Sequence, residues 1–273
     1  MPKLCANISM LFNELPFLER YQAAADYGFV GIECLFPYDY SIDEVATAVS
    51  NAGIPQVLIN TSAGHWDNGD RGLACIATRQ EEFQASVFQA LDYALGLGRP
   101  LVHVMAGTVP PDVSLESAEE TYLSNLRWAA EAAKKVGVQL TIEPINPIDM
   151  PDYMLSNQAQ ALCLLSKIDA PNVGLQFDFF HCEKHEGNAL AHFMASLDYI
   201  VHVQIAGVPQ RNEPDTGELD YGPVLAAIDA SDYSGFVGCE YRPLGGTVKG
   251  LGWMDGSEKK GVSCSHALRG NEV

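Results

Sequence analysis

The sequence predicts a single α/β domain in which eight parallel strands close into a barrel, the (β/α)8 or TIM-barrel architecture. Eight short, β-rich apolar runs occur along the chain, and helical patterns separate them in strict alternation. The runs are almost continuously apolar, as expected of parallel strands that are covered on both faces. A chain of 273 residues also suits this fold, for which about 250 residues are ordinary. An open, doubly wound sheet is the alternative architecture.

The predicted strands follow one another at roughly regular intervals of one βα unit. They span residues 4–8, 30–35, 56–60, 101–105, 138–143, 173–178, 200–205 and 236–240.

The segments between these strands carry signals for helix starts and ends. Pro16 is suited to the first turn of a helix that Gly28 would close. Ser41 and Glu44 have the spacing of a capping box. Gly53 is suited to end that helix.

Further helices are predicted over the remaining connections. Ser117 with Glu120 predicts the cap of a helix that runs to Gly137. Amphipathic stretches predict the others at 79–97, 157–168, 188–198 and 221–230. The barrel domain is therefore expected to span residues 1–256, and the polar stretch 257–273 is expected to form an irregular tail.

The charge balance argues against several classes of partner. The chain has 35 acidic and 16 basic residues, a net charge of -19. Such a chain repels phosphate backbones and anionic membrane surfaces, so neither nucleic acid nor membrane is an expected partner. An acidic substrate would need a local Arg or Lys.

The cysteines and the apolar runs indicate the compartment. Seven scattered cysteines without a C-x-x-C pair fit a reducing environment. The N-terminal stretch lacks the long apolar region of a signal peptide, and no run of about 18 apolar residues predicts a membrane span. The cytoplasm is the expected location. The sequence does not set the oligomeric state, and a homo-oligomer is compatible with it.

Side chains suited to metal binding stand at the ends of four consecutive predicted strands. They are Glu143, Asp178, Gln204 and Glu240. In a barrel the carboxyl ends of the strands form one face, so these groups are expected to converge. An all-oxygen donor set suits Mg²⁺ or Mn²⁺. Three carboxylates without a cation would repel one another. The sequence therefore predicts a divalent metal site.

Three further polar residues lie near this end. His181 follows Asp178 by three residues, in a predicted loop where it could bind substrate oxygens. His202 shares a strand face with Gln204 and is expected to be a satisfied core histidine. Glu33, near the end of the second strand, could position substrate or bond to a neighbouring residue, and the sequence does not decide between these roles.

Arg71 and Arg211 are the candidate anchors for an acidic substrate. Both follow predicted strands in loops at the expected active face. A planar guanidinium suits bidentate binding of a carboxylate. Lys184 is a third candidate.

At these residues the chain resembles the hydroxypyruvate isomerase family, a branch of the xylose-isomerase-like barrels. The resemblance covers residues 1–256 and rests on several motifs together. They include Phe36-Pro37-Tyr38-Asp39-Tyr40, Gly72-Leu73-Ala74-Cys75, Ile142-Glu143-Pro144-Ile145-Asn146, Gln204-Ile205-Ala206-Gly207, Glu213-Pro214, Gly238-Cys239-Glu240-Tyr241 and Gly250-Leu251-Gly252-Trp253-Met254-Asp255.

The resemblance implies a barrel with a divalent metal on Glu143, Asp178, Gln204 and Glu240. It also implies substrate contacts near His181 and Arg211. Related sugar epimerases usually have His where this chain has Gln204. Residues 102–107 and 202–207 look like the neighbouring 2-oxo-tetronate isomerase branch, whereas residues 143–146 look more like hydroxypyruvate isomerase.

The expected activity is the interconversion of hydroxypyruvate and tartronate semialdehyde through an enediol. Glu143 and Glu240 would act as the paired general acid and base, and no redox cofactor is needed. A 2-oxo-tetronate isomerase or a ketose 3-epimerase is the alternative. A metal-dependent endonuclease is disfavoured by the net charge of -19. A non-catalytic sugar-binding module is disfavoured because binding alone does not require two proton carriers.

Overall fold

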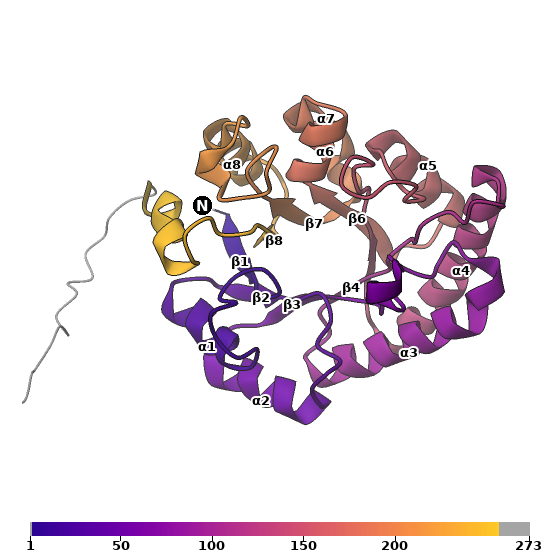
Figure 1. The fold of residues 1–273 in the computed structure, drawn as a ribbon, viewed down its shortest axis with the longest axis horizontal. Coiled ribbons are helices and arrows are strands. Elements are labelled where there is room, and N and C mark those ends of the chain that lie inside the picture. The colour runs from indigo at the N-terminus through magenta and orange to yellow at the C-terminus, as the bar shows by residue number, and fades with distance from the viewer. Residues whose placement is uncertain (1, 257–273) are drawn as a thin grey trace, which may run out of the picture.

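The computed structural model describes residues 2–256 and shows a closed barrel of eight parallel strands in sequence order (Figure 1). The last strand pairs with the first, so the sheet has no free edge. This confirms the predicted TIM barrel and excludes the open sheet. The strands are β1 (Lys3–Asn7), β2 (Gly31–Glu33), β3 (Gln56–Asn60), β4 (Leu101–His103), β5 (Leu140–Ile142), β6 (Val173–Asp178), β7 (Ile200–Ile205) and β8 (Phe236–Cys239).

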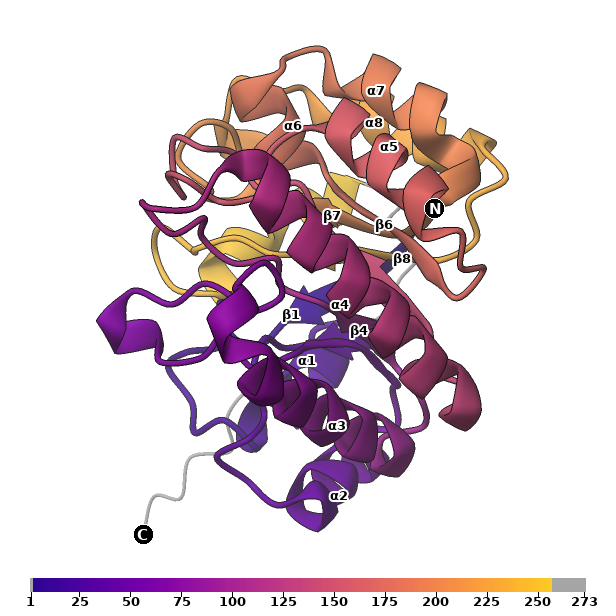
Figure 2. The same ribbon diagram turned by 90° about the vertical axis from the view of Figure 1, so that its right-hand side faces the viewer.

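A ring of helices surrounds the barrel, as Figure 1 and the side view in Figure 2 show. The α-helices are α1 (Glu19–Asp26), α2 (Ile42–Ala52), α3 (Gln80–Gly96), α4 (Leu115–Val136), α5 (Gln158–Ile168), α6 (Phe179–His185), α7 (Ala189–Ser196) and α8 (Tyr221–Ala230). Short 3₁₀ helices are η1 (Trp66–Asn68), η2 (Ala77–Arg79), η3 (Leu197–Tyr199), η4 (Pro214–Thr216) and η5 (Val248–Gly256). None of the described helices is both long and apolar enough to cross a membrane.

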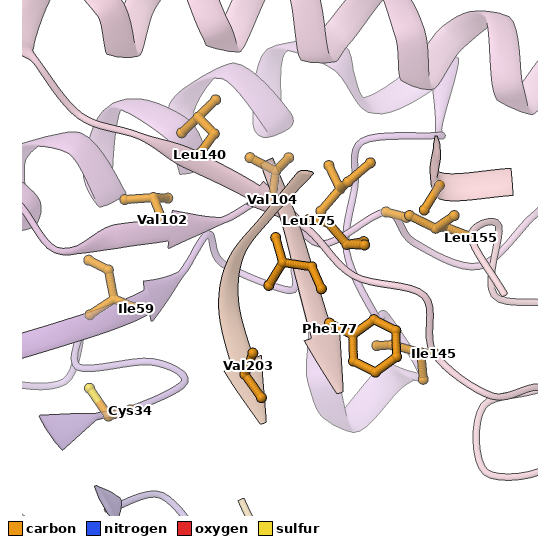
Figure 3. Close-up of a cluster of buried hydrophobic side chains, with 14 of the residues drawn as sticks. Cys34, Ile59, Val102, Val104, Leu140, Ile145, Leu155, Leu175, Phe177 and Val203 are labelled. Atoms are coloured by element: carbon orange, nitrogen blue, oxygen red, sulfur yellow. The ribbon is translucent and has the colours of Figure 1, made fainter. Parts of the chain in front are cut away.

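The main core lies between the outside of the barrel and the helix ring. Strand side chains such as Ile59, Val102 and Leu175 are buried there (Figure 3). Because these side chains alternate along each strand, their neighbours point into the barrel. The interior positions carry polar groups, among them Glu33, Gln176 and His202, all of which are buried.

Two predicted helix starts are wrong. The first helix begins at Glu19 and not at Pro16, since Pro16 only accepts a bond from the Glu19 backbone in the preceding turn. The cap of α4 is Ser114, whose side chain accepts from the backbone of Ser117. Ser114 has the extended backbone that a capping residue needs, so Ser117 already lies inside the helix.

Other local predictions are confirmed. Ser41 and Glu44 form both bonds of a capping box, and Gly53 ends α2 in the left-handed conformation. Helix α6 was not predicted, because β6 passes into it directly and Asp178 serves both as the last strand residue and as the helix cap. The predicted tail at 257–273 lies outside the described residues.

Candidate active site

A cavity of about 820 Å³ opens at the carboxyl ends of the strands. Segments that follow all eight strands contribute side chains to its wall, including Met10, Phe36, Glu143 and Glu240. The cavity therefore lies at the face where the sequence places the chemistry of a barrel.

Glu143 lies directly after β5 and is 5% exposed. Its Oε1 atom lies 3.9 Å from Nε2 of His181, and its Oε2 atom lies 3.6 Å from Nδ1 of His103. Burial, followed by the charges of Glu240 and Asp178, raises the pKa of Glu143 well above its usual range. A buried carboxyl with a raised pKa is a candidate general acid or base.

Asp178 is held by the first turn of α6. Its Oδ1 atom accepts the backbone N–H of Phe180 at 2.8 Å. Its Oδ2 atom lies 3.7 Å from Nε2 of His181 and 3.6 Å from the Arg211 guanidinium. Burial raises the pKa of Asp178 to about 6, although Arg211 opposes the rise.

Glu240 follows β8 and is paired with Arg211. The guanidinium donates to Oε1 of Glu240 at 2.7 Å and to its backbone oxygen at 3.3 Å. Burial raises the pKa of Glu240 to about 8, again against the effect of Arg211. Arg211 was predicted to anchor a substrate carboxylate. In the structure it lines the cavity and also forms ion pairs with Asp178 and Glu240.

Glu143, Asp178 and Glu240, here called the cavity carboxylates, lie at the carboxyl ends of their strands; Glu143 and Glu240 line the cavity, and Asp178 is buried beside Arg211. They adjoin a second group of polar residues. This buried polar layer consists of Glu33, His202, Gln204, Gln176 and Thr141. Register places Asp178 beside Gln204 and Gln176 beside His202 on neighbouring strands. The sequence left the role of Glu33 open. The structure shows that it bonds to its neighbours and does not line the cavity.

Hydrogen bonds from Thr141 through Gln176 and Gln204 to Glu33 form a chain in which each side chain donates to the next. The Thr141 hydroxyl donates to Oε1 of Gln176 at 2.9 Å, and Nε2 of Gln176 donates to Oε1 of Gln204 at 2.8 Å. Nε2 of Gln204 then donates to Glu33 at 2.8 Å and to Glu240. Gln204 thus turns its nitrogen, not its oxygen, toward Glu240. Its role as a metal ligand stays a prediction.

Glu33 is fully buried at the centre of this layer. It accepts from Nδ2 of Asn7 at 3.0 Å, and Nε2 of His202 lies 2.6 Å from its other oxygen. His202 is therefore a buried core histidine bonded to Glu33 through Nε2, but it is not fully satisfied as expected, because its buried Nδ1 has no hydrogen-bond partner within residues 2–256. Gly238 lies against the same carboxylate, since a Cβ atom there would come within 2.4 Å of Glu33.

His181 lies in the first turn of α6 and not in a loop, contrary to the sequence prediction. It lines the cavity and is buried. Its Nδ1 atom contacts Asn146, a residue that sequence reasoning noted only as part of a family motif, with the amide nitrogen 2.6 Å away.

The remaining cationic side chains near the cavity differ in the contacts they make. Arg71 lines the cavity, and its guanidinium lies 3.8 Å from the centre of the Trp66 ring. Lys184 forms an ion pair with Asp149 at 2.6 Å. Arg242 also lines the cavity and was missed, although it follows Glu240 by only two residues.

The donor set fits a divalent cation. Oε1 of Glu143 and Oδ2 of Asp178 are buried, and within residues 2–256 neither atom has a hydrogen-bond partner. Ligand atoms of Glu143, Asp178 and His181 all lie within 4.8 Å of one another. Buried carboxylate oxygens without partners are costly unless a cation or substrate satisfies them. Hard oxygen donors suit Mg²⁺ or Mn²⁺.

A closed barrel with acids of raised pKa around one cavity defines the class of barrel enzymes that bind a small molecule at their carboxyl face. The chain belongs to the xylose isomerase-like TIM barrel family, whose model matches residues 21–256.

Curated relatives cover nearly the whole chain. A 2-oxo-tetronate isomerase of Cupriavidus necator is 43% identical over 93% of this chain and 98% of its own length. The hydroxypyruvate isomerase of Escherichia coli is 42% identical over 93% of this chain and 99% of its own length. This chain is an isomerase enzyme of the same family.

Solved structures agree on the fold. The crystal structure of an AP endonuclease, family 2, from Brucella melitensis is 40% identical with a TM-score of 0.91, covering 94% of this chain and 99% of that one. A D-psicose 3-epimerase from Clostridium cellulolyticum is 19% identical with a TM-score of 0.74, covering 90% of this chain and 87% of that one. The latter likeness concerns the fold alone.

Proposed function

We propose that this isomerase interconverts hydroxypyruvate and tartronate semialdehyde (2-hydroxy-3-oxopropanoate) by moving a proton between two adjacent carbons. The observation that carries the proposal is the pair Glu143 and Glu240, two buried acids that directly follow β5 and β8 and line one cavity. The pKa of each is raised, by burial first, and that of Glu240 reaches about 8, which favours groups that hold and transfer a proton.

In the proposed reaction one glutamate takes a proton from the hydroxymethyl carbon of hydroxypyruvate, which leaves an enediol. The other glutamate delivers a proton to the neighbouring carbon, and the hydroxyl proton of the first carbon passes to the oxygen of the second, so that the ketone becomes an alcohol and the alcohol becomes an aldehyde. No electron leaves the substrate, and no redox cofactor is required. Either glutamate can begin, depending on the direction of the reaction.

Arginine and histidine side chains support the binding of the acid. Arg211 and Arg71 bring positive charge to the cavity of a protein with a net charge of -19, and His181 adds a polar contact beside them. We propose that these three residues hold the substrate, with Arg211 also keeping Glu240 and Asp178 in place.

A divalent ion, Mg²⁺ or Mn²⁺, would be held by Glu143, Asp178, Gln204 and Glu240. When bound, such an ion supplies Lewis-acid polarisation of substrate oxygens. Support comes from one buried oxygen each of Glu143 and Asp178, for which the described residues offer no hydrogen-bond partner. Coordination by Gln204 requires that its oxygen, which now accepts from Gln176, also reach the ion.

A 2-oxo-tetronate is the second candidate substrate. The cavity of about 820 Å³ leaves room beyond a three-carbon acid, and the relative with that name is as similar as the hydroxypyruvate isomerase. A ketose 3-epimerase has support from the fold only.

We expect the enzyme to act in the cytoplasm, on a hydroxy-keto acid that is free in solution.

The test is a substrate panel on protein stripped of metal and then reconstituted with Mg²⁺ or Mn²⁺. We expect hydroxypyruvate to give the highest kcat/KM and the stripped protein to be inactive. A higher kcat/KM with 2-oxo-tetronate would move the assignment to that substrate. Turnover of ketoses alone would reject the hydroxy-keto acid class, and full activity after thorough stripping would reject the metal.

A further inference from the structure

We infer that Asn146 is a positioning residue that fixes His181 in the tautomer with its proton on Nε2. His181 would then donate a hydrogen bond into the cavity and would not be a ligand of the divalent ion. The consequence for turnover rests on the proposed function, whereas the tautomer is a property of the protein alone.

The orientation of the Asn146 amide follows from its surroundings. Its Oδ1 atom lies 2.9 Å from the backbone nitrogen of Asp149, which can only donate. The other end of the amide must therefore be the NH₂ group. This assignment also matches Oδ2 of Asp149, which accepts from Nδ2 of Asn146 at 3.1 Å and from Nζ of Lys184 at 2.9 Å.

The amide orientation determines the role of the imidazole. Nδ1 of His181 lies 2.6 Å from Nδ2 of Asn146 and 3.4 Å from the Asn146 backbone nitrogen. Both neighbours are donors, so Nδ1 must accept and cannot carry a proton. A neutral imidazole with an unprotonated Nδ1 has its proton on Nε2.

The Nε2–H group points at the cavity carboxylates without bonding to them. It lies 3.9 Å from Oε1 of Glu143 and 3.7 Å from Oδ2 of Asp178, both too far for a hydrogen bond. By residue type and spacing these three side chains resemble a metal site. Coordination by histidine, however, requires a nitrogen lone pair, which Nε2 lacks in this tautomer.

A free N–H donor beside two acids suits an oxygen that gains negative charge during the reaction. The enediol formed from a hydroxy-keto acid has such an oxygen, and a positioned donor stabilises it. The separation of roles is then simple: the carboxylates take the cation and the proton, while His181 binds a substrate oxygen.

The tautomer can be read from long-range ¹H–¹⁵N NMR spectra of metal-free, ¹⁵N-labelled protein, before and after addition of Mg²⁺. His181→Gln identifies the signals of this residue among the seven histidines. We expect a protonated-type shift at Nε2 and an unprotonated-type shift at Nδ1 in both states. A proton on Nδ1, or an Nε2 shift that changes to the metal-bound type with Mg²⁺, would overturn the inference.

Asn146→Asp reverses the polarity of the contact, since a carboxylate can only accept from Nδ1. We expect the proton to appear on Nδ1, and kcat to fall by about 10²–10³-fold, the loss typical of one missing oxyanion donor, with a smaller change in KM. The matched control is Asn157→Asp, the same change at the N-cap of α5, where Asp also caps well. It should leave both the spectrum and kcat unaltered.

An unchanged His181 spectrum in a folded Asn146→Asp protein would reject the positioning role. If that variant does not fold, Asn146→Ala replaces it, and a population with Nδ1 protonated is then expected because only the backbone donor remains; its absence would equally reject the role of the amide. Failure of the proposed function gives a different result: the wild type would not turn over hydroxy-keto acids, yet its tautomer would be as stated.

Discussion

The three cavity carboxylates and Glu33, the acid of the buried polar layer, are all buried, yet their bonding differs. Glu33 in the buried layer has close polar neighbours at both oxygens. Within the part of the chain that the structure describes, Glu143 and Asp178 each keep one buried oxygen without a hydrogen-bond partner. A satisfied acid stabilises the fold, whereas an unsatisfied acid is a cost that the protein tolerates for binding or catalysis. Burial alone therefore does not distinguish a structural acid from a functional one.

The largest expected effect concerns the two proton carriers. Glu143→Gln and Glu240→Gln keep size and an oxygen donor but remove the base, so we expect each to lower kcat by about 10²–10⁴-fold. The metal-free melting temperature should stay level or rise, because a neutral amide relieves the repulsion among the cavity carboxylates.

Kinetics, metal content and thermal denaturation must be measured on the same samples, so that loss of metal is not mistaken for loss of the base. Deuterium exchange separates the two roles: the variant without the donating glutamate should still exchange the substrate proton. Near-normal turnover in both variants with metal retained would refute the two-glutamate mechanism.

Glu33→Gln should lower the stability of the protein, whereas Glu143→Gln and Glu240→Gln should keep or raise it. Its amide nitrogen would meet the donors of Asn7 and Gln204 or the ring nitrogen of His202. We expect the free energy of unfolding to fall by about 1–3 kcal/mol, the cost of leaving buried donors unpaired. Urea denaturation measures this, with Glu143→Gln as the matched control. An unchanged free energy of unfolding for Glu33→Gln would remove the contrast between the two regions.

Arg211 contacts two of the cavity carboxylates and is also a proposed anchor for the substrate. Arg211→Lys keeps the charge but loses the 2.7 Å hydrogen bond to Glu240 and alters the ion pair with Asp178. A hydrogen bond to a charged group contributes about 1.5–3 kcal/mol. We expect kcat/KM to fall by about 10–100-fold. Arg71→Lys should cost only a few fold, because a stack on an exposed ring contributes about 0.5–1 kcal/mol. Equal effects, or a larger one at Arg71, would make Arg71 the main anchor.

The most gradual expected effect is the pH dependence of metal-free stability. The pKa of Glu240 is raised from 4.5 to about 8, and that of Asp178 from 3.8 to about 6. The folded state thus holds these protons more tightly than the unfolded state. Their stabilising contribution is complete below about pH 4 and is lost as the pH rises through 6 and 8, by at most about 1.4 kcal/mol per pH unit and group.

Denaturation curves at several pH values measure this slope. Glu240→Gln should flatten it between pH 6 and 8, and added Mg²⁺ should protect most at the upper end, where the carboxylates are charged. A wild-type stability that rises over this interval, or a variant with the same slope, would contradict the pKa assignment of Glu240.

Sequence periodicity was sufficient for the barrel but not for every boundary. The strands at 56–60, 173–178 and 200–205 were predicted with the observed limits. Their runs are rich in apolar residues, and Pro55 and Asn172 precede two of them. Helix α6 escaped because Phe179 follows the strand without a break, and its seven residues are too few to show a helical period.

The predicted site residues could be named from the sequence because acids at strand ends converge in any barrel. The orientation of the polar side-chain groups could not be predicted from the sequence. Which atom of Gln204 faces Glu240 depends on Glu33 and Gln176, and which nitrogen of His181 carries a proton depends on Asn146. These partners come from other strands, so their contacts exist only after the barrel closes.

The close approach of Gly238 to Glu33 predicts a pattern in the sequences of related proteins. Any side chain at position 238 would occupy the space of the Glu33 carboxylate. We therefore expect the two positions to change together among relatives: chains that keep the acid should keep glycine, and chains with a larger residue at 238 should have lost the acid. The pair would then be a sequence marker for the buried polar layer in proteins known only from their genes.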